Sequence, residues 1–337
     1  MGDPAGSGIS RPSDAELEQG LIRALATNGQ AEPRSVMRRP SAYRTSFPLE
    51  ELDLELADGT RLRLAFKQLG WSTLGKEARL AKPKFLHDPR REAAVYSSVL
   101  APSGLSAPHC YGSLVEPQDD RYWLFLEWIE GRELYQVGEL ELWKAAARWL
   151  ATAHLALAQD FDPHVEVGHL VAYDERYYWR WMERAAEFAS APGGSTASSG
   201  PLKRLASRYG HVVESLLELP RTVLHGEFYA SNVLVVGEES APRVAPVDWE
   251  LAASGPGLVD LAALVSGDWR DEDREAIVDA YRAIPGIGEF SQRQLDFARL
   301  HLAVQWLGWA PPAWVPPEGQ RHDWLAEALA LAEGLGL

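Results

Sequence analysis

The chain has 337 residues, of which 46% are hydrophobic, so it can bury a sizeable core and form two lobes or domains. Its net charge of −15 argues against a nucleic-acid partner, because phosphate contacts need a basic face. No apolar run approaches the ~18 residues of a membrane span, and the N-terminus lacks the apolar segment of a signal peptide. The single cysteine, Cys110, excludes an internal disulfide framework and fits a reducing compartment, so we expect a cytoplasmic protein without a membrane partner.

Hydrophobic residues that alternate with polar ones predict an antiparallel sheet in the first part of the chain. Ser13-Asp14-Ala15-Glu16 has the spacing of a capping box and predicts a short helix before the sheet. A period of two over residues 35–69, interrupted at Asp58-Gly59, predicts a first strand and then a hairpin. Residues 112–115 and 122–128 are expected to add two strands, which gives a sheet of five.

Two segments separate the third strand from the fourth. Residues 71–87 carry several basic side chains and no clear period, and we expect an insertion or mobile loop there. Asp88-Pro89 predicts the start of a helix that continues to about Leu100, with Glu92 in its first turn.

Beyond Gly131 the hydrophobic period becomes helical. Residues 191–199 are rich in Gly and Ser and predict a loop. Helices are expected over residues 139–157, 173–190, 202–217, 271–283, 291–307 and 322–335.

One motif carries recognisable chemistry: Leu224-His225-Gly226-Glu227-Phe228-Tyr229-Ala230-Ser231-Asn232. Apolar runs at 233–236 and 244–247 follow it and predict a hairpin that brings Asn232 close to Asp248. An amide oxygen and a carboxylate are hard ligands that suit Mg²⁺, while the Glu227 carboxylate can orient or deprotonate a hydroxyl. The set predicts the catalytic core of a phosphotransferase.

Three blocks in this order resemble the aminoglycoside phosphotransferase and choline kinase family: the motif at 224–232, Val247-Asp248-Trp249-Glu250, and Gly255-Pro256-Gly257-Leu258-Val259-Asp260-Leu261. The resemblance covers roughly residues 35–310. It implies an α+β, bilobal, protein-kinase-like fold with a small antiparallel-sheet N-lobe and a larger, mainly helical C-lobe. We expect an N-terminal tail with a short helix over 1–30, an N-lobe over 31–129 and a C-lobe over 130–337.

The resemblance also implies how ATP, or GTP, and Mg²⁺ would bind. Asn232 and Asp248 would hold Mg²⁺. Lys67 would bind phosphate, and Glu92 would orient the Lys67 side chain by a salt bridge. The alternative for this pair is an exposed strand-end Lys and a helix N-terminal Glu that the helix dipole stabilises.

The segment after the fifth strand resembles the hinge of the family. There the backbone C=O of Glu127 and the N–H of Ile129 would bind the adenine edge, with Leu126 behind it. His225 is expected to be a buried scaffold side chain and not a general base. Asp260 is expected to brace the catalytic loop through hydrogen bonds.

Two departures from the family pattern affect the site. Glu227 stands where the family has Asp, so its carboxylate sits farther out unless the loop retreats. The nucleotide loop has no glycine, and Ser41, Thr45 and Ser46 are the candidate phosphate donors in its place. An ordinary polar turn is the alternative for this loop.

The sequence says least about the identity of the acceptor molecule. An acidic and aromatic lining would suit an amino sugar or a choline-like cation, but the same residues, at helical spacing, more often form core and helix N-termini. They are Tyr173, Asp174, Tyr177, Tyr178, Trp179 and Trp181, and later Asp268, Trp269, Asp271, Glu272 and Asp273.

The sequence leaves three alternative hypotheses for the function. The first is an ATP-dependent kinase that phosphorylates a hydroxyl of a small molecule such as an amino sugar, a sugar or another natural product. The second is a Ser/Thr kinase acting on a peptide in natural-product biosynthesis. The third is a nucleotide-binding pseudokinase with a regulatory or partner role, against which the retained Lys67, Glu92, Asn232 and Asp248 argue.

Overall fold

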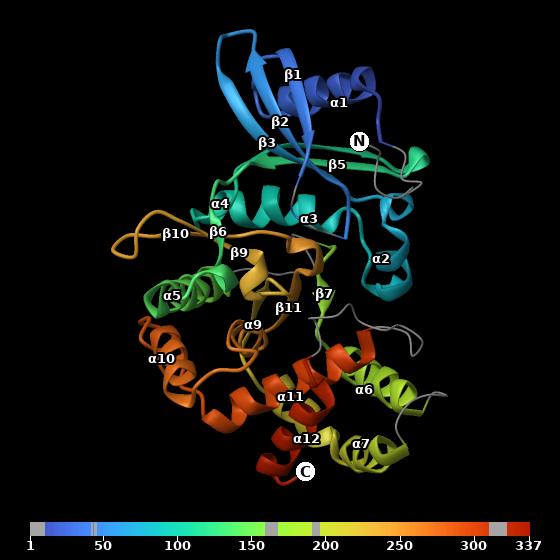
Figure 1. The fold of residues 1–337 in the computed structure, drawn as a ribbon, viewed down its shortest axis with the longest axis vertical. Helices are drawn as coiled ribbons and strands as arrows, with labels where there is room; N and C mark the ends of the chain where they lie inside the picture. Colours follow the sequence, from blue (N-terminus) through green and yellow to red (C-terminus); the bar gives the residue numbers. More distant parts are fainter. Residues whose placement is uncertain (1–10, 42, 44–45, 159–167, 191–195, 310–321) are drawn as a thin grey trace.

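The computed structural model describes residues 11–41, 43, 46–158, 168–190, 196–309 and 322–337. A sheet lies at one end of the molecule and helices fill the other end (Figure 1). This arrangement confirms the expected α+β fold with a small N-lobe and a mainly helical C-lobe.

The N-lobe is built on a five-stranded antiparallel sheet, as the hydrophobic period predicts. Its strand order is β1-β2-β3-β5-β4, with bounds β1 Pro33–Pro40, β2 Leu49–Leu56, β3 Arg61–Gln68, β4 Cys110–Glu116 and β5 Arg121–Glu127. In β2 every second residue is buried, because the side chains of a strand alternate between its two faces. Helix α1 (Asp14–Thr27) covers one face through Leu17, Leu21 and Leu25.

The N-terminus of α1 has the expected capping box. The Ser13 hydroxyl accepts a hydrogen bond from the Glu16 N–H, and the Glu16 carboxylate accepts one from the Ser13 N–H. Replacing Ser13 with alanine should therefore destabilise the protein by about 1 kcal/mol, since one helical N–H loses its acceptor. Chemical denaturation would measure the loss, and an unchanged midpoint would show that α1 adds nothing to the stability of the lobe.

The other face of the sheet packs against the helix expected after Asp88. It runs as α3 (Arg91–Ala94), a π-helical stretch (Val95–Leu100) and α4 (Ala101–Ser103). Val95, Tyr96 and Val99 are buried against the sheet. This helix positions Glu92 beneath β3.

Residues 71–87, expected to be an insertion or mobile loop, contain regular structure that the sequence did not predict. The segment contains a 3₁₀ turn (Trp71–Thr73), helix α2 (Lys76–Ala81) and a second 3₁₀ turn (Lys84–Leu86). Leu74, Lys82 and Leu86 are buried. Their partners lie far away in the sequence, so no local period reveals this structure.

The C-lobe contains the expected helices with three changes, and it has one helix that was not predicted, α9. Residues 202–217 form two helices that meet at Tyr209, α7 begins inside the expected Gly/Ser loop, and the helix expected from residue 173 begins at Glu175. Residues 191–195 of that loop lie outside the described residues. The helices are α5 Leu140–Ala156, α6 Glu175–Ser190, α7 Thr196–Arg208, α8 Gly210–Leu217, α9 Leu258–Leu264, α10 Asp271–Arg282, α11 Gln292–Trp309 and α12 Trp324–Leu335.

Two small sheets lie between the N-lobe and the helices of the C-lobe, and they hold the catalytic motif. One has the order β10-β9-β6 and the other β7-β11-β8. Their strands are β6 Arg132–Glu133, β7 Val171–Ala172, β8 Arg221–Leu224, β9 Val233–Val236, β10 Arg243–Pro246 and β11 Ala253–Pro256. The motif therefore joins two sheets, β8 on one side and β9 on the other.

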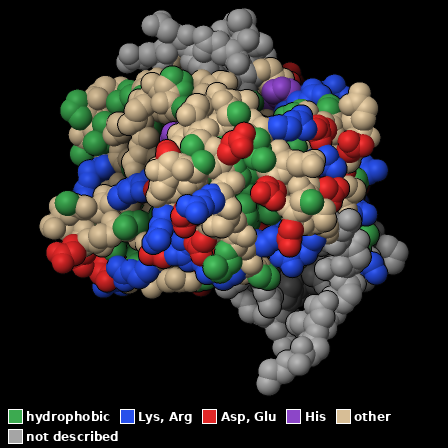
Figure 2. Space-filling model, turned by 90° about the horizontal axis from the view of Figure 1, so that it is seen from above, with side chains coloured by type: hydrophobic (Ala, Val, Ile, Leu, Met, Phe, Trp, Pro, Cys, Tyr) green, Lys and Arg blue, Asp and Glu red, His purple; other side chains and the backbone are tan. Residues whose placement is uncertain are grey.

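Acidic and basic side chains are interspersed on the described surface that is seen from above the N-lobe (Figure 2). Cross-strand pairs such as Arg39 with Asp53 and Arg63 with Glu51 contribute to this pattern. Among the described residues, we find no helix with the length and apolar character needed to cross a membrane.

Candidate active site

The hairpin of β9 and β10 brings Asn232 and Asp248 to the same end, as the sequence predicts. The Val247 N–H donates to the Asn232 carbonyl over 2.8 Å, which closes the hairpin beside both residues. Asp248 has φ 68° and ψ 58°, a left-handed conformation that is uncommon for a non-glycine residue and is often found at functional sites. Both side chains line a pocket of about 790 Å³ between the lobes.

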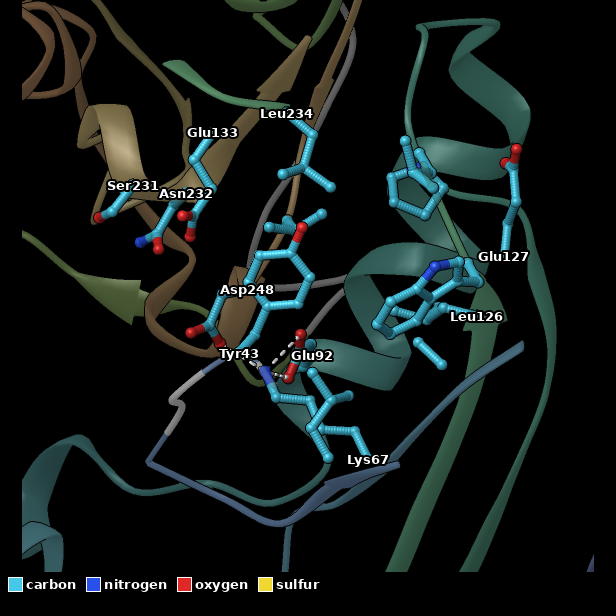
Figure 3. Close-up of a pocket in the computed structure, with 16 residues that line it drawn as sticks. Tyr43, Lys67, Glu92, Leu126, Glu127, Glu133, Ser231, Asn232, Leu234 and Asp248 are labelled. Carbon is cyan, nitrogen blue, oxygen red and sulfur yellow. Dashed lines mark hydrogen bonds and ion pairs between the residues drawn. The ribbon is translucent and has the colours of Figure 1, made fainter. Parts of the chain in front are cut away.

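Lys67 and Glu92 meet in the same pocket. The Lys67 ammonium donates to both Glu92 carboxylate oxygens, at 2.9 and 2.8 Å, and also pairs with Asp248 (Figure 3). Burial alone would lower the pKa of Lys67, but the Asp248 and Glu92 carboxylates outweigh it and raise that pKa. Lys67 is 5% exposed and Glu92 1%, which contradicts the alternative of an exposed strand-end pair.

The end of β5 and the segment after it form another part of the pocket wall. Leu126, Glu127 and Ile129, the residues of the predicted hinge, line the pocket there. The Glu127 side chain pairs with Arg243 at 2.7 Å, so its carboxylate already has a structural partner.

Several residues that line the pocket were not predicted from the sequence as site residues, among them Tyr43, Glu133 and Ser231. In Figure 3 Glu133 and Ser231 lie beside Asn232. The Tyr43 and Trp128 ring centroids are 5.9 Å apart. Ser231 belongs to the motif and could have been noticed, whereas Glu133 and Tyr43 reach the pocket only through the fold.

Of the hydroxyls expected to replace a glycine-rich loop, the two that belong to described residues do not line the pocket. Ser41 and Ser46 are not among its lining residues, and Thr45 lies outside the described residues. The Ser41 hydroxyl accepts a hydrogen bond from the Tyr43 N–H over 3.1 Å. This contact is the one expected of a polar turn, which was the alternative for this segment.

Glu227 lies next to the pocket and is not part of its lining. Its backbone carbonyl accepts a hydrogen bond from the Asn232 side-chain amide at 2.9 Å. Burial, followed by the Glu250 and Asp248 carboxylates, raises the pKa of Glu227 to about 8. Burial and the two neighbouring carboxylates therefore disfavour the charged form of Glu227.

Asp260 and His225 have the structural positions that were expected. Asp260 accepts hydrogen bonds from the N–H groups of His225 and Gly226 at 2.6 and 2.9 Å. His225 is 1% exposed, and its Nε2 donates to the Val247 carbonyl. Gly226 has φ 85°, and a Cβ atom there would lie 2.2 Å from the Leu251 carbonyl oxygen, so only glycine fits this turn.

A second buried cation, Lys82, was missed by sequence reasoning. It follows α2 and pairs with the Glu250 carboxylate, two residues beyond Asp248. Arg91 adds a link, because its guanidinium donates to the Glu250 carbonyl over 2.6 Å. Residues 71–91 are thus fastened to the chain that follows Asp248.

The aromatic and acidic residues considered as an acceptor lining mostly have structural roles. Tyr173, Tyr177, Tyr178 and Trp181 are at most 6% exposed and belong to the core of the C-lobe. The acids at the start of α10 pair with neighbouring arginines, Asp271 with Arg274 and Asp273 with Arg270. The structure favours the core and helix-terminus interpretation of these residues.

A family model described as "Phosphotransferase enzyme family" matches residues 78–301, more than half of the chain. The chain therefore belongs to the phosphotransferase enzyme family. This confirms the predicted class of enzyme, a phosphotransferase with an alcohol group as acceptor. No curated protein sequence matches the chain.

Solved structures share the fold at low sequence identity. A microcompartment-associated aminopropanol kinase has 15% identity and a TM-score of 0.63, with 92% of this chain and 94% of that chain covered. The GDP complex of wild-type aminoglycoside 2'-phosphotransferase-IIIa has 13% identity and a TM-score of 0.59, with 89% and 93% covered. A choline/ethanolamine kinase family protein from Mesorhizobium loti has 17% identity and a TM-score of 0.53, with 90% and 87% covered. These likenesses confirm the protein-kinase-like fold.

Proposed function

We propose that this protein transfers the γ-phosphoryl group of ATP or GTP, with Mg²⁺, to a hydroxyl of a small molecule such as an amino sugar, a sugar or another natural product. The observation that carries the proposal is the arrangement of Lys67, Glu92, Asn232 and Asp248 around one interlobe pocket. Phosphoryl transfer depends mainly on positioning and on neutralising phosphate charge, and a buried cation beside two oxygen ligands suits that task.

The donor atoms present fit Mg²⁺. The Asn232 amide donates its N–H to the Glu227 carbonyl, which leaves its side-chain oxygen available as a ligand. The Asp248 carboxylate is the second hard oxygen ligand, and Mg²⁺ commonly completes its shell with phosphate oxygens and water. Bound there, Mg²⁺ would offset negative charge on the phosphates.

Within the proposal, Glu227 orients the acceptor. The acceptor oxygen bonds to the γ-phosphorus as the bond from that phosphorus to the β–γ bridging oxygen breaks. The nucleoside diphosphate leaves, and the hydroxyl proton passes to the Glu227 carboxylate and from there to water. Lys67 holds the phosphates throughout, with Glu92 fixing its ammonium.

Replacing Glu227 with glutamine should slow phosphoryl transfer by about 10²-fold or more, because the amide cannot accept the hydroxyl proton. Nucleotide affinity should stay within about twofold, since Glu227 does not line the nucleotide pocket. Steady-state kinetics and calorimetric titration with a nucleotide would measure the two effects. An unchanged rate would remove Glu227 from its proposed role.

A direct test incubates the protein with Mg²⁺ and ATP, or GTP, and a panel of amino sugars, sugars, choline and Ser/Thr peptides. Mass spectrometry then detects the gain of one phosphoryl group. A phosphorylated small molecule is the expected result, and a phosphorylated peptide would favour the peptide kinase. Nucleotide binding with no transfer to any acceptor would favour the pseudokinase.

A further inference from the structure

The backbone of the predicted hinge departs from regular strand pairing at Glu127, the last residue of β5. The Glu127 N–H donates to the His109 carbonyl over 2.7 Å. In a regular antiparallel pair, the His109 N–H would donate back to the Glu127 carbonyl. It donates instead to the Glu127 side-chain carboxylate, over 3.1 Å. The carboxylate thus takes the place of the carbonyl in the pairing with the segment before β4.

The pairing of β5 with β3 does not use the Glu127 carbonyl either. The Trp128 N–H donates to the Arg63 carbonyl over 3.0 Å, which makes these two residues a hydrogen-bonded pair. Bonded and non-bonded pairs alternate along an antiparallel ladder, so the next pair, Leu64 with Glu127, is a non-bonded one. Outside the strand ladders of the described residues, no hydrogen bond uses the Glu127 carbonyl or the Ile129 N–H.

Arg243, the first residue of β10, holds the Glu127 carboxylate in this position. Its guanidinium donates to both carboxylate oxygens, at 2.7 and 2.8 Å, and to the Ala107 carbonyl over 3.3 Å. The Arg243 bonds, together with the His109 N–H, keep the pKa of Glu127 below its usual range, although partial burial acts against them. Two bonds from one guanidinium also fix the plane of the carboxylate. We call Glu127, Arg243 and His109 the hinge bracket.

The hinge backbone is the part of the pocket that can distinguish one base from another. Leu126 and Leu234 line the pocket there, and Leu234 packs with Ile129 in one buried cluster. Apolar side chains can contact the faces of a purine, but only hydrogen-bonding groups distinguish its edges. In Figure 3 Glu127 lies well apart from Asp248, so a nucleotide can place its base near one and its phosphates near the other.

We propose that the hinge bracket makes the nucleotide site select adenine over guanine, with Glu127 and Arg243 as positioning residues. This inference rests on the proposed function and adds the identity of the base. The adenine edge carries an amino donor at C6 and an acceptor at N1, which match the Glu127 carbonyl and the Ile129 N–H. Guanine carries an oxygen at C6 and an N–H at N1, so acceptor would face acceptor and donor would face donor. The phosphoryl donor would accordingly be ATP and not GTP.

The test compares ADP, GDP and inosine diphosphate, each titrated calorimetrically into the full chain with Mg²⁺. Hypoxanthine has the C6 oxygen and the N1–H of guanine but lacks its 2-amino group. We expect ADP to bind about tenfold or more tightly than either of the others, because both mismatched bases leave polar groups unpaired. Inosine diphosphate that binds as tightly as ADP would assign any discrimination to the 2-amino group and overturn the proposal. GDP binding within about threefold of ADP would overturn it as well.

Glu127→Ala should weaken ADP about tenfold or more and leave GDP within about twofold, because the His109 N–H can then donate to the carbonyl of residue 127. Glu127→Gln keeps an acceptor for that N–H and should recover part of the preference. Arg243→Gln should lower the preference too, since the carboxylate is then held by the His109 N–H alone.

The matched control is Arg23→Gln, which removes an arginine that pairs with Glu116 outside the pocket and should keep the wild-type preference. A merely structural bracket would weaken all three diphosphates equally. A ratio of ADP to GDP affinity that Glu127→Ala leaves unchanged would therefore overturn the role of the bracket.

The outcomes separate this inference from the proposed function. Preference for ADP without transfer to any acceptor would contradict the proposed function and leave the selection of adenine standing. Transfer from GTP with a kcat/KM equal to that of ATP would contradict the selection alone. Absence of binding by all three diphosphates would overturn both.

Discussion

Replacing Asp248 with alanine is expected to lower Mg²⁺·ATP turnover by about 10³-fold or more. The carboxylate is one of two proposed Mg²⁺ ligands, and its loss removes the charge that positions the metal on the phosphates. The fold should survive, because Lys67 keeps its bond to Glu92 on the other side of the pocket. Release of nucleoside diphosphate, measured over a range of Mg²⁺ concentrations, gives the effect.

The matched control for this experiment is Asp279→Ala. Asp279 is an exposed acid on α10 that pairs with Arg282, outside the pocket. We expect wild-type turnover from it and an unchanged melting temperature for both variants. Turnover by Asp248→Ala close to that of the control would refute the metal assignment.

The second large effect is expected from Lys82→Met. Lys82 and Glu250 are 6% and 9% exposed, so removing the ammonium leaves an unpaired carboxylate in the interior. Breaking a buried pair in this way typically costs about 3–5 kcal/mol, more than a surface pair contributes. Thermal unfolding should show a marked loss of stability, and turnover should fall because residues 71–91 lose their anchor beside Asp248.

Two comparisons isolate the ion pair. Lys84→Met changes an exposed lysine of the same segment and should have little effect on stability. Combining Lys82→Met with Glu250→Gln should recover much of the lost stability, since no unpaired charge then remains. Equal melting temperatures for Lys82→Met and Lys84→Met would show that the pair is dispensable.

Local sequence patterns are enough to predict the elements whose signals lie within a few residues of one another. Alternation in β2 and β3 predicted the sheet, and the Ser13 capping box predicted the start of α1. The motif at 224–232 and the position of Asp248 predict that the catalytic residues lie at one end of a hairpin. The turn of a hairpin fixes which residues of its two strands meet. Lys67 and Glu92 could be placed because the family resemblance supplied their pairing.

Charged side chains that meet over long sequence distances can be identified only from the folded chain. Lys82 and Glu250 are separated by 168 positions, and Arg91 and Glu250 by 159, so no local period records either contact. The Tyr/Trp stripe of α6 has a spacing that more often forms core than a ligand lining, and burial in the C-lobe core confirms that interpretation. Burial and charge pairing depend on partners from distant segments, and folding brings those segments together.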